Sequence, residues 1–316
     1  MRLPAVLRSP PPRVALEIGP SRVAAVSVTG SAGRGVTVDA WAVEPLPPGA
    51  VAPSLTAPNV ADPAVLADAV GRLWQRLGLR PKRVALLVPD ATAKVSIVRF
   101  KDVPAKASDL DELVKFQVRK AVPFRLEDSQ VSYAAGERTP DGQDFVVVQA
   151  RREIVEEYER ACLATGAAPG IVELASFGLA QCALVTSGGI AGDWLLIHAG
   201  SEDATIAIFR GRHPVFFRNR SASGDGHLGE LVHQTAMYYQ DRLGGQGLAR
   251  VFAGGVAAGD LSTPVWTAIQ ERLGAAAEIV GAGGSLSVPA RRGLAPGDLE
   301  AMAPALGVVA SRWAEH

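Results

Sequence analysis

The sequence predicts an α/β protein of two similar half-domains, with an α+β unit inserted into the first. Two hairpin patterns indicate the duplication. Residues 13–28 (RVALEIGPSRVAAVSV) and 194–209 (WLLIHAGSEDATIAIF) each join two apolar runs through a polar turn that contains Gly. The pattern of elements changes between residues 90 and 165, which indicates the insertion. The two hairpin tips are expected to face each other, either across a nucleotide or as a purely structural frame.

The composition argues against two classes of function. The 316 residues include 32 Lys plus Arg and 32 Asp plus Glu, so the formal net charge is zero. Such a chain has no overall field to attract nucleic acid or an anionic membrane. No apolar run approaches the roughly 18 residues of a spanning helix, and the N-terminal apolar stretch is too short for a signal peptide. Any membrane role is therefore expected to depend on a partner.

The first half-domain is expected to begin with the hairpin at 13–28, whose tip is Gly19-Pro20-Ser21. A helix is predicted from Asp62-Pro63 to Leu77, because its apolar residues recur at helical spacing and Gly78 accepts the left-handed backbone of a helix end. The other predicted elements are a strand at 35–43, a Pro-rich loop at 45–58 and a strand at 83–88.

The inserted unit is expected to be a small α+β domain. Its first helix should have Ser108 as N-cap, with acidic residues from Asp109 to Glu112 near the positive end of the helix dipole. Basic residues on the opposite side of this helix indicate either a solvated face or a partner-binding patch. The predicted elements are a strand at 94–100, a helix at 109–121, strands at 130–137 and 144–150, and a helix at 152–165.

The second half-domain is expected to repeat the alternation of strands and helices, after an amphipathic helix at 173–186 closes the first. Cys162 and Cys182 fall on separate helical patterns without metal-ligand spacing, so both are predicted to be buried, reduced thiols, as in a cytoplasmic protein. The predicted elements after the second hairpin are a strand around 215–217, a helix at 226–243, a strand at 249–252, a helix at 265–273, a strand near 279–280 and a helical tail at 296–313.

One stretch is more specific than these patterns. FQVRKAVPF at residues 116–124, followed by an acidic strand that contains Tyr133, resembles the PilM family of type IV pilus assembly, actin-like proteins related to the division protein FtsA. Residues 172–180 (VELASFGLA) and 303–309 (APALGVV) also look like family segments. The resemblance covers nearly the whole chain. It implies an α/β, actin-like (ribonuclease H-like) two-domain fold with an inserted α+β subdomain of the FtsA type, called 1C.

The resemblance also implies domain boundaries. The first actin-like domain, subdomain 1A, would comprise residues 1–89, 169–190 and 296–316, and the inserted 1C-like subdomain would comprise 90–168. A reduced second domain, 2A, would comprise 191–295. Between the strand that ends near Arg218 and the next helix the family usually has a further subdomain, 2B, which is predicted to be missing here because only about ten residues intervene.

In the family, the two hairpin tips and a Gly-Gly turn hold a nucleotide. Residues 17–24 match the phosphate-1 loop, residues 197–200 match the phosphate-2 loop, and residues 253–255 match the adenosine turn. Gly lets backbone N–H groups approach phosphate, and a carboxylate can hold Mg²⁺ or its waters. If the site is retained, the nucleotide-binding residues would be Glu17, Gly19, Ser21, Gly200, Ser201, Gly254 and Gly255, with Glu17 also the candidate Mg²⁺ residue.

Four departures from the family pattern fall on this chemistry. The carboxylate of the first loop is lengthened to Glu17, a tolerable change because Mg²⁺ is often held through water. Pro20 has no N–H to offer phosphate, and Ala24 replaces a Lys. His198 replaces an Asp and cannot serve as an anionic Mg²⁺ ligand at neutral pH. We expect His198 to be a packed or hydrogen-bonded histidine. Together the departures favour a pseudo-ATPase with a degenerate nucleotide site over an active enzyme.

The resemblance implies a cytoplasmic scaffold that is peripheral to the inner membrane through its partner. It would dock the cytoplasmic tail of a PilN-like inner-membrane protein and contact components of the pilus motor, and self-association is open. An extended tail can bind through apolar anchors and main-chain hydrogen bonds. The groove would lie between the first actin-like subdomain and the inserted one. The matching residues are Phe116, Val118, Val122, Pro123 and Phe124, for which a core role is equally compatible with the sequence.

Two alternatives remain open at this point. An active actin-like ATPase or kinase would bind Mg-ATP through Glu17 and a second carboxylate, from Glu202 or Asp203. The cytoplasmic module of a type II secretion platform shares the same actin-like plan.

Overall fold

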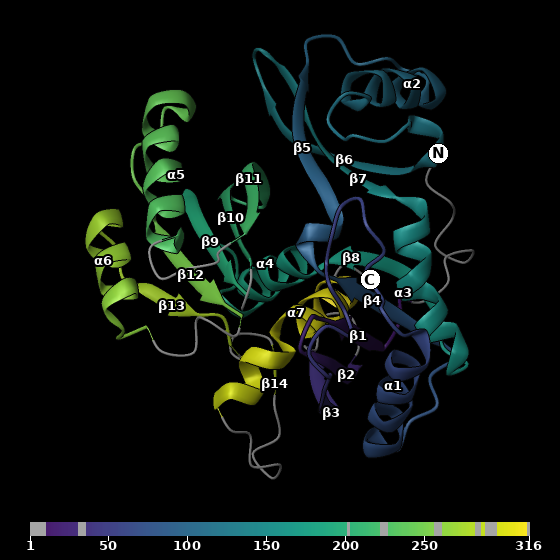
Figure 1. Ribbon diagram of the computed structural model, residues 1–316. Helices are drawn as coiled ribbons and strands as arrows, with labels where there is room; N and C mark the ends of the chain where they lie inside the picture. The colour runs from purple at the N-terminus through teal and green to yellow at the C-terminus, as the bar shows by residue number, and fades with distance from the viewer. Residues whose placement is uncertain are drawn as a thin grey trace.

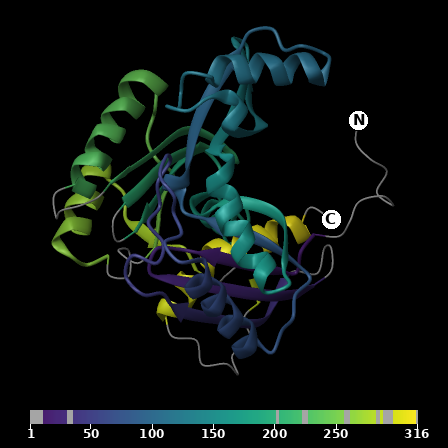
Figure 2. The ribbon, with the colours of Figure 1, turned by 45° about the vertical axis from the view of Figure 1, so that its right-hand side comes forward.

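The computed structural model describes residues 11–30, 36–200, 203–221, 227–255, 261–281, 286–287 and 296–314. These residues form two α/β lobes and a smaller unit that projects from the first lobe (Figure 1). Each lobe has its own β-sheet, and helices α4 (Ala175–Thr186) and α7 (Pro296–Ala314) lie between the two lobes. Figure 2 shows the projecting unit standing clear of the sheet of the first lobe.

The first sheet has six strands in the order β14-β3-β2-β1-β4-β8. β1, β2 and β3 form an antiparallel meander, and β4 and β8 continue the sheet parallel to β1. Helices cover both faces, which explains why β1 and β4 are apolar almost throughout. The strands are β1 (Val14–Ile18), β2 (Arg22–Gly30), β3 (Val36–Pro45), β4 (Arg83–Val88), β8 (Ala168–Leu174) and β14 (Leu286–Ser287).

The second sheet repeats this plan with five strands in the order β11-β10-β9-β12-β13. An antiparallel meander is again followed by two parallel strands, so the predicted duplication is confirmed. Only residues 222–226 separate β11 from helix α5 (His227–Leu243), and the absence of a 2B subdomain there stays a prediction. The strands are β9 (Asp193–Ala199), β10 (Asp203–Arg210), β11 (His213–Ser221), β12 (Arg250–Gly254) and β13 (Ala277–Ile279).

Helix α1 (Pro63–Leu77) has the predicted ends. The backbone N–H of Ala64 donates to Oδ1 of Asp62 over 2.9 Å, and Gly78 ends the helix with a φ of 66°. The apolar face of α1 packs on the first sheet. On the second sheet, α5 and α6 (Pro264–Leu273) cover the outer face, with Trp266 in their shared core.

Helices α4 and α7 approach each other without intervening side chains. A β carbon added at Gly307 would overlap the carbonyl oxygen of Gly178, and one added at Gly178 would overlap that of Pro304. Gly is therefore required at both positions by the helix contact. The two helices fill a single core between the sheets, which contains Leu87, Leu179, Cys182, Leu196, Leu306 and Val309.

The inserted unit is a three-stranded sheet, ordered β5-β7-β6, that carries α2 on one face. It has a small core of its own, formed by Phe100, Val114, Val118, Phe145 and Val147. Helix α3, which follows β7, packs against α1 in the core of the first lobe instead. The domain boundaries stay a prediction. The elements are β5 (Ala93–Phe100), α2 (Ala107–Val118), β6 (Ser129–Thr139), β7 (Gly142–Arg151) and α3 (Arg152–Ala164).

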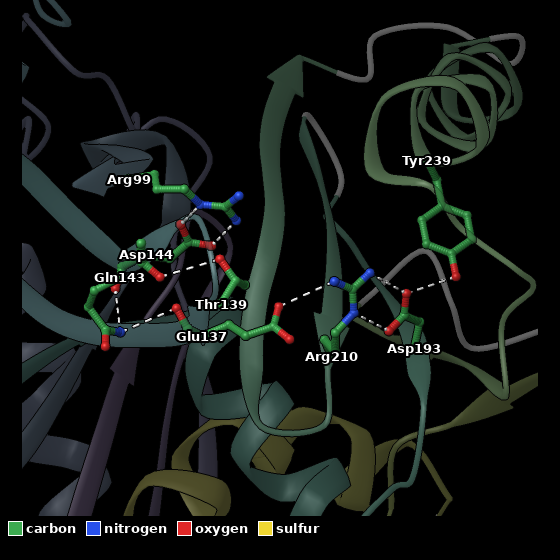
Figure 3. Close-up of polar contacts among 9 residues, drawn as sticks. Arg99, Glu137, Thr139, Gln143, Asp144, Asp193, Arg210 and Tyr239 are labelled. Carbon is green, nitrogen blue, oxygen red and sulfur yellow. Dashed lines mark hydrogen bonds and ion pairs between the residues drawn. The ribbon is translucent and has the colours of Figure 1, made fainter. Parts of the chain in front are cut away.

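A chain of polar contacts ties the inserted unit to the second lobe (Figure 3). Arg210 of β10 donates to both carboxylate oxygens of Asp193 in β9, over 2.9 and 3.0 Å, and to Glu137 of β6 over 3.3 Å. Tyr239 of α5 donates its hydroxyl to Asp193 over 2.9 Å. These four residues, which we call the Arg210 network, connect three strands and a helix.

Three local predictions were wrong. The helix predicted at 109–121 ends at Val118, three residues early, with Arg119 as its C-cap. The helix predicted at 173–186 begins only at Ala175, because β8 precedes it directly and no turn residue separates the strand from α4. Ser108 is not the N-cap of α2, since the helix begins at Ala107 with Lys106 as an N-cap that makes no side-chain bond. The hydroxyl of Ser108 instead donates to Asp109 over 2.9 Å.

Both cysteines are buried, free thiols, as predicted. Burial raises the pKa of Cys162 and of Cys182 to about 12, so neither reacts readily as a thiolate. Across the described ranges, we find no helix with the length and hydropathy needed to cross a membrane.

Candidate functional site

The two hairpin tips line one cleft between the lobes. The cleft encloses about 590 Å³, part of which is open to solvent. Its floor and walls come from the ends of strands in both sheets. The lining residues are Glu17, Ile18, Gly19, Pro20, Ser21, Arg22, Pro89, Asp90 and Ala175 from the first lobe, and His198, Gly200, Asp203 and Gly255 from the second.

Glu17 lies on the floor of the cleft, near the end of β1. It is only 9% exposed, and its Oε2 is buried without a hydrogen-bond partner in the described part of the chain. Burial raises the pKa of Glu17, an effect that the charges of Arg22 and His198 only partly offset. Glu300 of α7 is comparable, because its Oε1 is buried without a partner among the described residues and burial raises its pKa.

Asp90 is a carboxylate of the cleft with both oxygens in hydrogen bonds. It follows β4 and is 3% exposed. Oδ1 accepts hydrogen bonds from the backbone N–H and hydroxyl of Ser176, over 3.1 and 2.8 Å, and so caps the start of α4. Oδ2 accepts from the hydroxyl of Thr205 over 2.7 Å and lies 3.2 Å from Nδ1 of His198. We call Asp90, Ser176, His198 and Thr205 the Asp90 cluster.

His198 occupies the position in β9 that Glu17 occupies in β1. Each is the next-to-last residue of its strand and pairs with the second hairpin strand, His198 with Thr205 and Glu17 with Ala24. Burial lowers the pKa of His198, but the hydrogen bond and charge of Asp90 outweigh burial and raise it, with help from Glu17 and Asp203. His198 is thus a hydrogen-bonded histidine, as predicted.

The carboxyl of Asp90 shows the reciprocal effect. Burial raises its pKa, but the hydrogen bond and charge of His198 and the bonds from Thr205 and Ser176 together lower it. The two shifts are mutual, since each group favours the charged form of the other across the 3.2 Å contact.

The glycines of the cleft have different roles. Gly19 donates its N–H to the carbonyl of Arg22 over 2.9 Å, and Gly200 donates to the carbonyl of Asp203 over 2.8 Å, so each closes its own hairpin turn. Gly255 has a φ of 95° and lies against the end of β9, where a β carbon would come within 2.9 Å of the His198 ring. Gly254 instead faces Leu179 of α4, outside the cleft lining.

Of the remaining candidates for nucleotide binding, some lie within the described residues and some lie outside them. Ser21 is exposed at the tip of the first hairpin, and its carbonyl accepts the N–H of Leu46 over 2.8 Å. Ser201 and the alternative carboxylate Glu202 lie outside the described residues. Asp203, the other alternative, lines the cleft and accepts a hydrogen bond from the Asn219 amide over 2.7 Å.

The residues predicted to bind a partner do not form one surface. Phe116 is 58% exposed on α2, with the guanidinium of Arg119 3.9 Å from its ring centroid. Pro123 is exposed and Phe124 is half-buried. Val118 and Val122 are buried, and Val118 belongs to the core of the inserted unit. Three of the five side chains are therefore accessible.

Asp90 is the residue that the sequence did not predict. Its signal was its place directly after the strand predicted at 83–88, since functional side chains in α/β sheets gather at the carboxyl ends of parallel strands. Its partners were not predictable, because they come from segments 86, 108 and 115 residues away.

Two duplicated α/β lobes that face each other across such a cleft, with an α+β unit inserted into the first, define a protein of the actin-like class. The sequence profile of the type IV pilus assembly protein PilM matches residues 15–241 of this chain. The chain therefore belongs to the PilM family.

Solved structures agree with this fold. A chain of the structure described as a PilM-PilN type IV pilus biogenesis complex superposes with a TM-score of 0.79 at 18% identity, covering 97% of this chain and 99% of that one. The cytoplasmic domain of EpsL, an inner membrane component of the Vibrio cholerae type II secretion system, superposes with a TM-score of 0.51 at 10% identity, covering 93% of this chain and 94% of that one.

Proposed function

We propose that this protein is a cytoplasmic scaffold of a type IV pilus assembly machine, held at the inner membrane by a PilN-like protein whose cytoplasmic tail it docks. The observation that carries the proposal is the match of nearly the whole chain to a protein of the PilM-PilN complex, together with membership of the PilM family. On this proposal the scaffold also contacts components of the pilus motor.

The tail is proposed to bind beside α2 of the inserted unit. Phe116, Pro123 and Phe124 offer apolar contacts, whereas Val118 and Val122 support them from the core. The Arg119 guanidinium over the Phe116 ring adds a positive charge next to the apolar contact. An extended tail with a few apolar side chains and an acidic residue would match this surface.

The test is titration of a fluorescent peptide of the tail into the full chain, followed by anisotropy. We expect Phe116→Ala to weaken binding by about tenfold or more, as for an apolar anchor. Met237→Ala is the matched control, because Met237 is similarly exposed (48%) but lies on α5. Equal affinity for wild type and Phe116→Ala would move the docking site elsewhere, and no binding by any variant would refute the proposed function.

The cleft is proposed to be a degenerate nucleotide site. Support comes from three of its features: Pro20 offers no N–H, Ala24 is buried and uncharged, and both oxygens of Asp90 are already hydrogen-bonded. The groups that line the cleft therefore fit a magnesium-bound triphosphate poorly.

An active ATPase or kinase is the second candidate, because Glu17 lines the cleft and its buried Oε2 has no hydrogen-bond partner among the described residues. Calorimetric titration with Mg-ATP separates the two. The degenerate site predicts no micromolar binding. Micromolar binding that is lost in Glu17→Ala but kept in Glu278→Ala, a carboxylate on the surface of the second lobe, would refute the degenerate site and favour the enzyme alternative.

A further inference from the structure

The Asp90 cluster joins the two lobes at the base of the cleft. Asp90 belongs to the first lobe, where it follows β4 in the short helix η2 (Asp90–Thr92). His198 and Thr205 belong to neighbouring strands of the second lobe, and Ser176 lies in the first turn of the helix between the sheets. A single buried carboxylate thus receives hydrogen bonds from both sides of the interlobe boundary.

The charges around His198 also come from both lobes. Asp90 and Glu17 reach it from the first lobe, Asp203 from the second, and Glu300 from α7, while Arg22 lies near the two glutamates. Carboxylates gathered in a buried site repel one another unless a cation lies among them. His198 is the group that these carboxylates share as an electrostatic neighbour, and its protonated ring would supply such a cation.

We propose that the Asp90 cluster holds the two lobes in a closed arrangement by means of the protein's own side chains, so that closure does not depend on a bound ligand. In this account His198 serves as an internal cation between carboxylates of the two lobes. The proposal concerns the cleft and not the docking surface on α2, so it can fail while the proposed function stands.

The competing explanation is that packing alone fixes the lobes. Helices α4 and α7 fill one core between the two sheets, and their Gly178–Gly307 contact leaves little freedom. The two explanations differ in what they require of His198. If packing is sufficient, a change of charge at position 198 lowers stability without moving the lobes in the molecules that remain folded.

The distance between the lobes can be measured directly with spin labels. Gln75 of α1 and Glu271 of α6 are exposed and lie in different lobes, so the pair Gln75→Cys and Glu271→Cys reports on lobe separation. The native Cys162 and Cys182 are buried and do not need to be removed. Pulsed electron spin resonance then gives the distance distribution in the full chain.

We expect one narrow distribution in the otherwise wild-type chain, unchanged by added Mg-ATP. His198→Asp places a second carboxylate against Asp90 and should shift the distribution to longer, broader distances. His198→Asn, which keeps a polar group near the Nδ1 position without the charge, should shift it less. Circular dichroism confirms that each labelled variant is folded.

Thr205→Val removes one donor to Asp90 with little change of shape, and serves if His198→Asp does not fold. It should broaden the distribution as well. Glu278→Gln, which breaks an ion pair with Arg250 inside the second lobe, should leave the distribution unchanged. The proposal is overturned if folded His198→Asn and Thr205→Val both keep the wild-type distribution, or if the wild-type distribution narrows only when Mg-ATP is added.

Discussion

Glu137 of β6 accepts a hydrogen bond of 3.3 Å from Nη1 of Arg210, whose other nitrogens hold Asp193 in the second lobe. This pair joins the inserted unit to the second lobe, while α3, directly after that unit, packs in the first. The inserted unit is therefore attached to both lobes, and its position depends on how the lobes lie.

Arg210→Met is expected to lower the free energy of unfolding by about 1 to 2 kcal/mol, because Asp193 loses a bidentate partner at a mostly buried position. Arg250→Met, at the more exposed pair with Glu278, should cost about 0.5 kcal/mol or less. Urea unfolding measures both. Similar losses for the two variants would show that the Arg210 network has no special role.

The His198–Asp90 pair should make stability depend on pH in two directions. The pKa of His198 is raised above 6.5, so its contribution is fully present below pH 6.5 and is lost as the pH rises through the folded value. The pKa of Asp90 is lowered below 3.8, so its contribution is present above pH 3.8 and is lost as the pH falls through the folded value.

The stability that the pair adds should therefore be largest between these limits. Unfolding free energies of wild type and His198→Asn, measured from pH 4 to pH 9, provide the check. We expect the difference between the two proteins to be greatest near pH 5 to 6 and to shrink in alkaline solution. A constant difference across this range would mean that the imidazole contributes by packing only.

Glu17→Gln is expected to stabilise the protein by about 1 kcal/mol at pH 7, because it replaces a buried carboxylate, whose Oε2 has no partner among the described residues, by a neutral amide that is less costly to bury. The raised pKa of Glu17 sets the sign: the cost of its charge is present above the folded pKa and absent below 4.5. The gain should thus vanish in acid. Thermal unfolding of wild type and Glu17→Gln, measured at pH 7 and in acid below pH 4.5, tests this. Destabilisation by Glu17→Gln at pH 7 would contradict it.

Gly255→Ala should destabilise more than Gly274→Ala. Both glycines have positive φ values, 95° and 63°, which Ala adopts only with strain. At Gly255 a β carbon would also meet the end of β9, whereas at Gly274 it meets nothing within 4 Å. We expect a cost of about 1 kcal/mol for Gly274→Ala and at least twice that for Gly255→Ala. Equal costs would show that the contact with β9 relaxes easily.

Much of the fold follows from local signals in the sequence. The two hairpins were predictable because each tip interrupts an alternating apolar pattern, and the ends of α1 were predictable because Asp62 and Gly78 are capping residues. The boundary between β8 and α4 was not, since Leu174 and Ala175 carry no signal that separates strand from helix.

The candidate site was predictable only in outline. Glu17 and His198 could be placed on facing tips because the hairpin pattern repeats. The bond between Asp90 and His198 could not, since it depends on how two separately folded sheets come together.

The central claim is that the protein docks the tail of a PilN-like protein as a scaffold, without help from a nucleotide. Its most direct test is the dissociation constant of the tail peptide and the full chain, measured by calorimetry with and without Mg-ATP. The account predicts the same dissociation constant in both conditions and weaker binding by Phe116→Ala. Tail binding that appears only with Mg-ATP, or no tail binding at all, would contradict it.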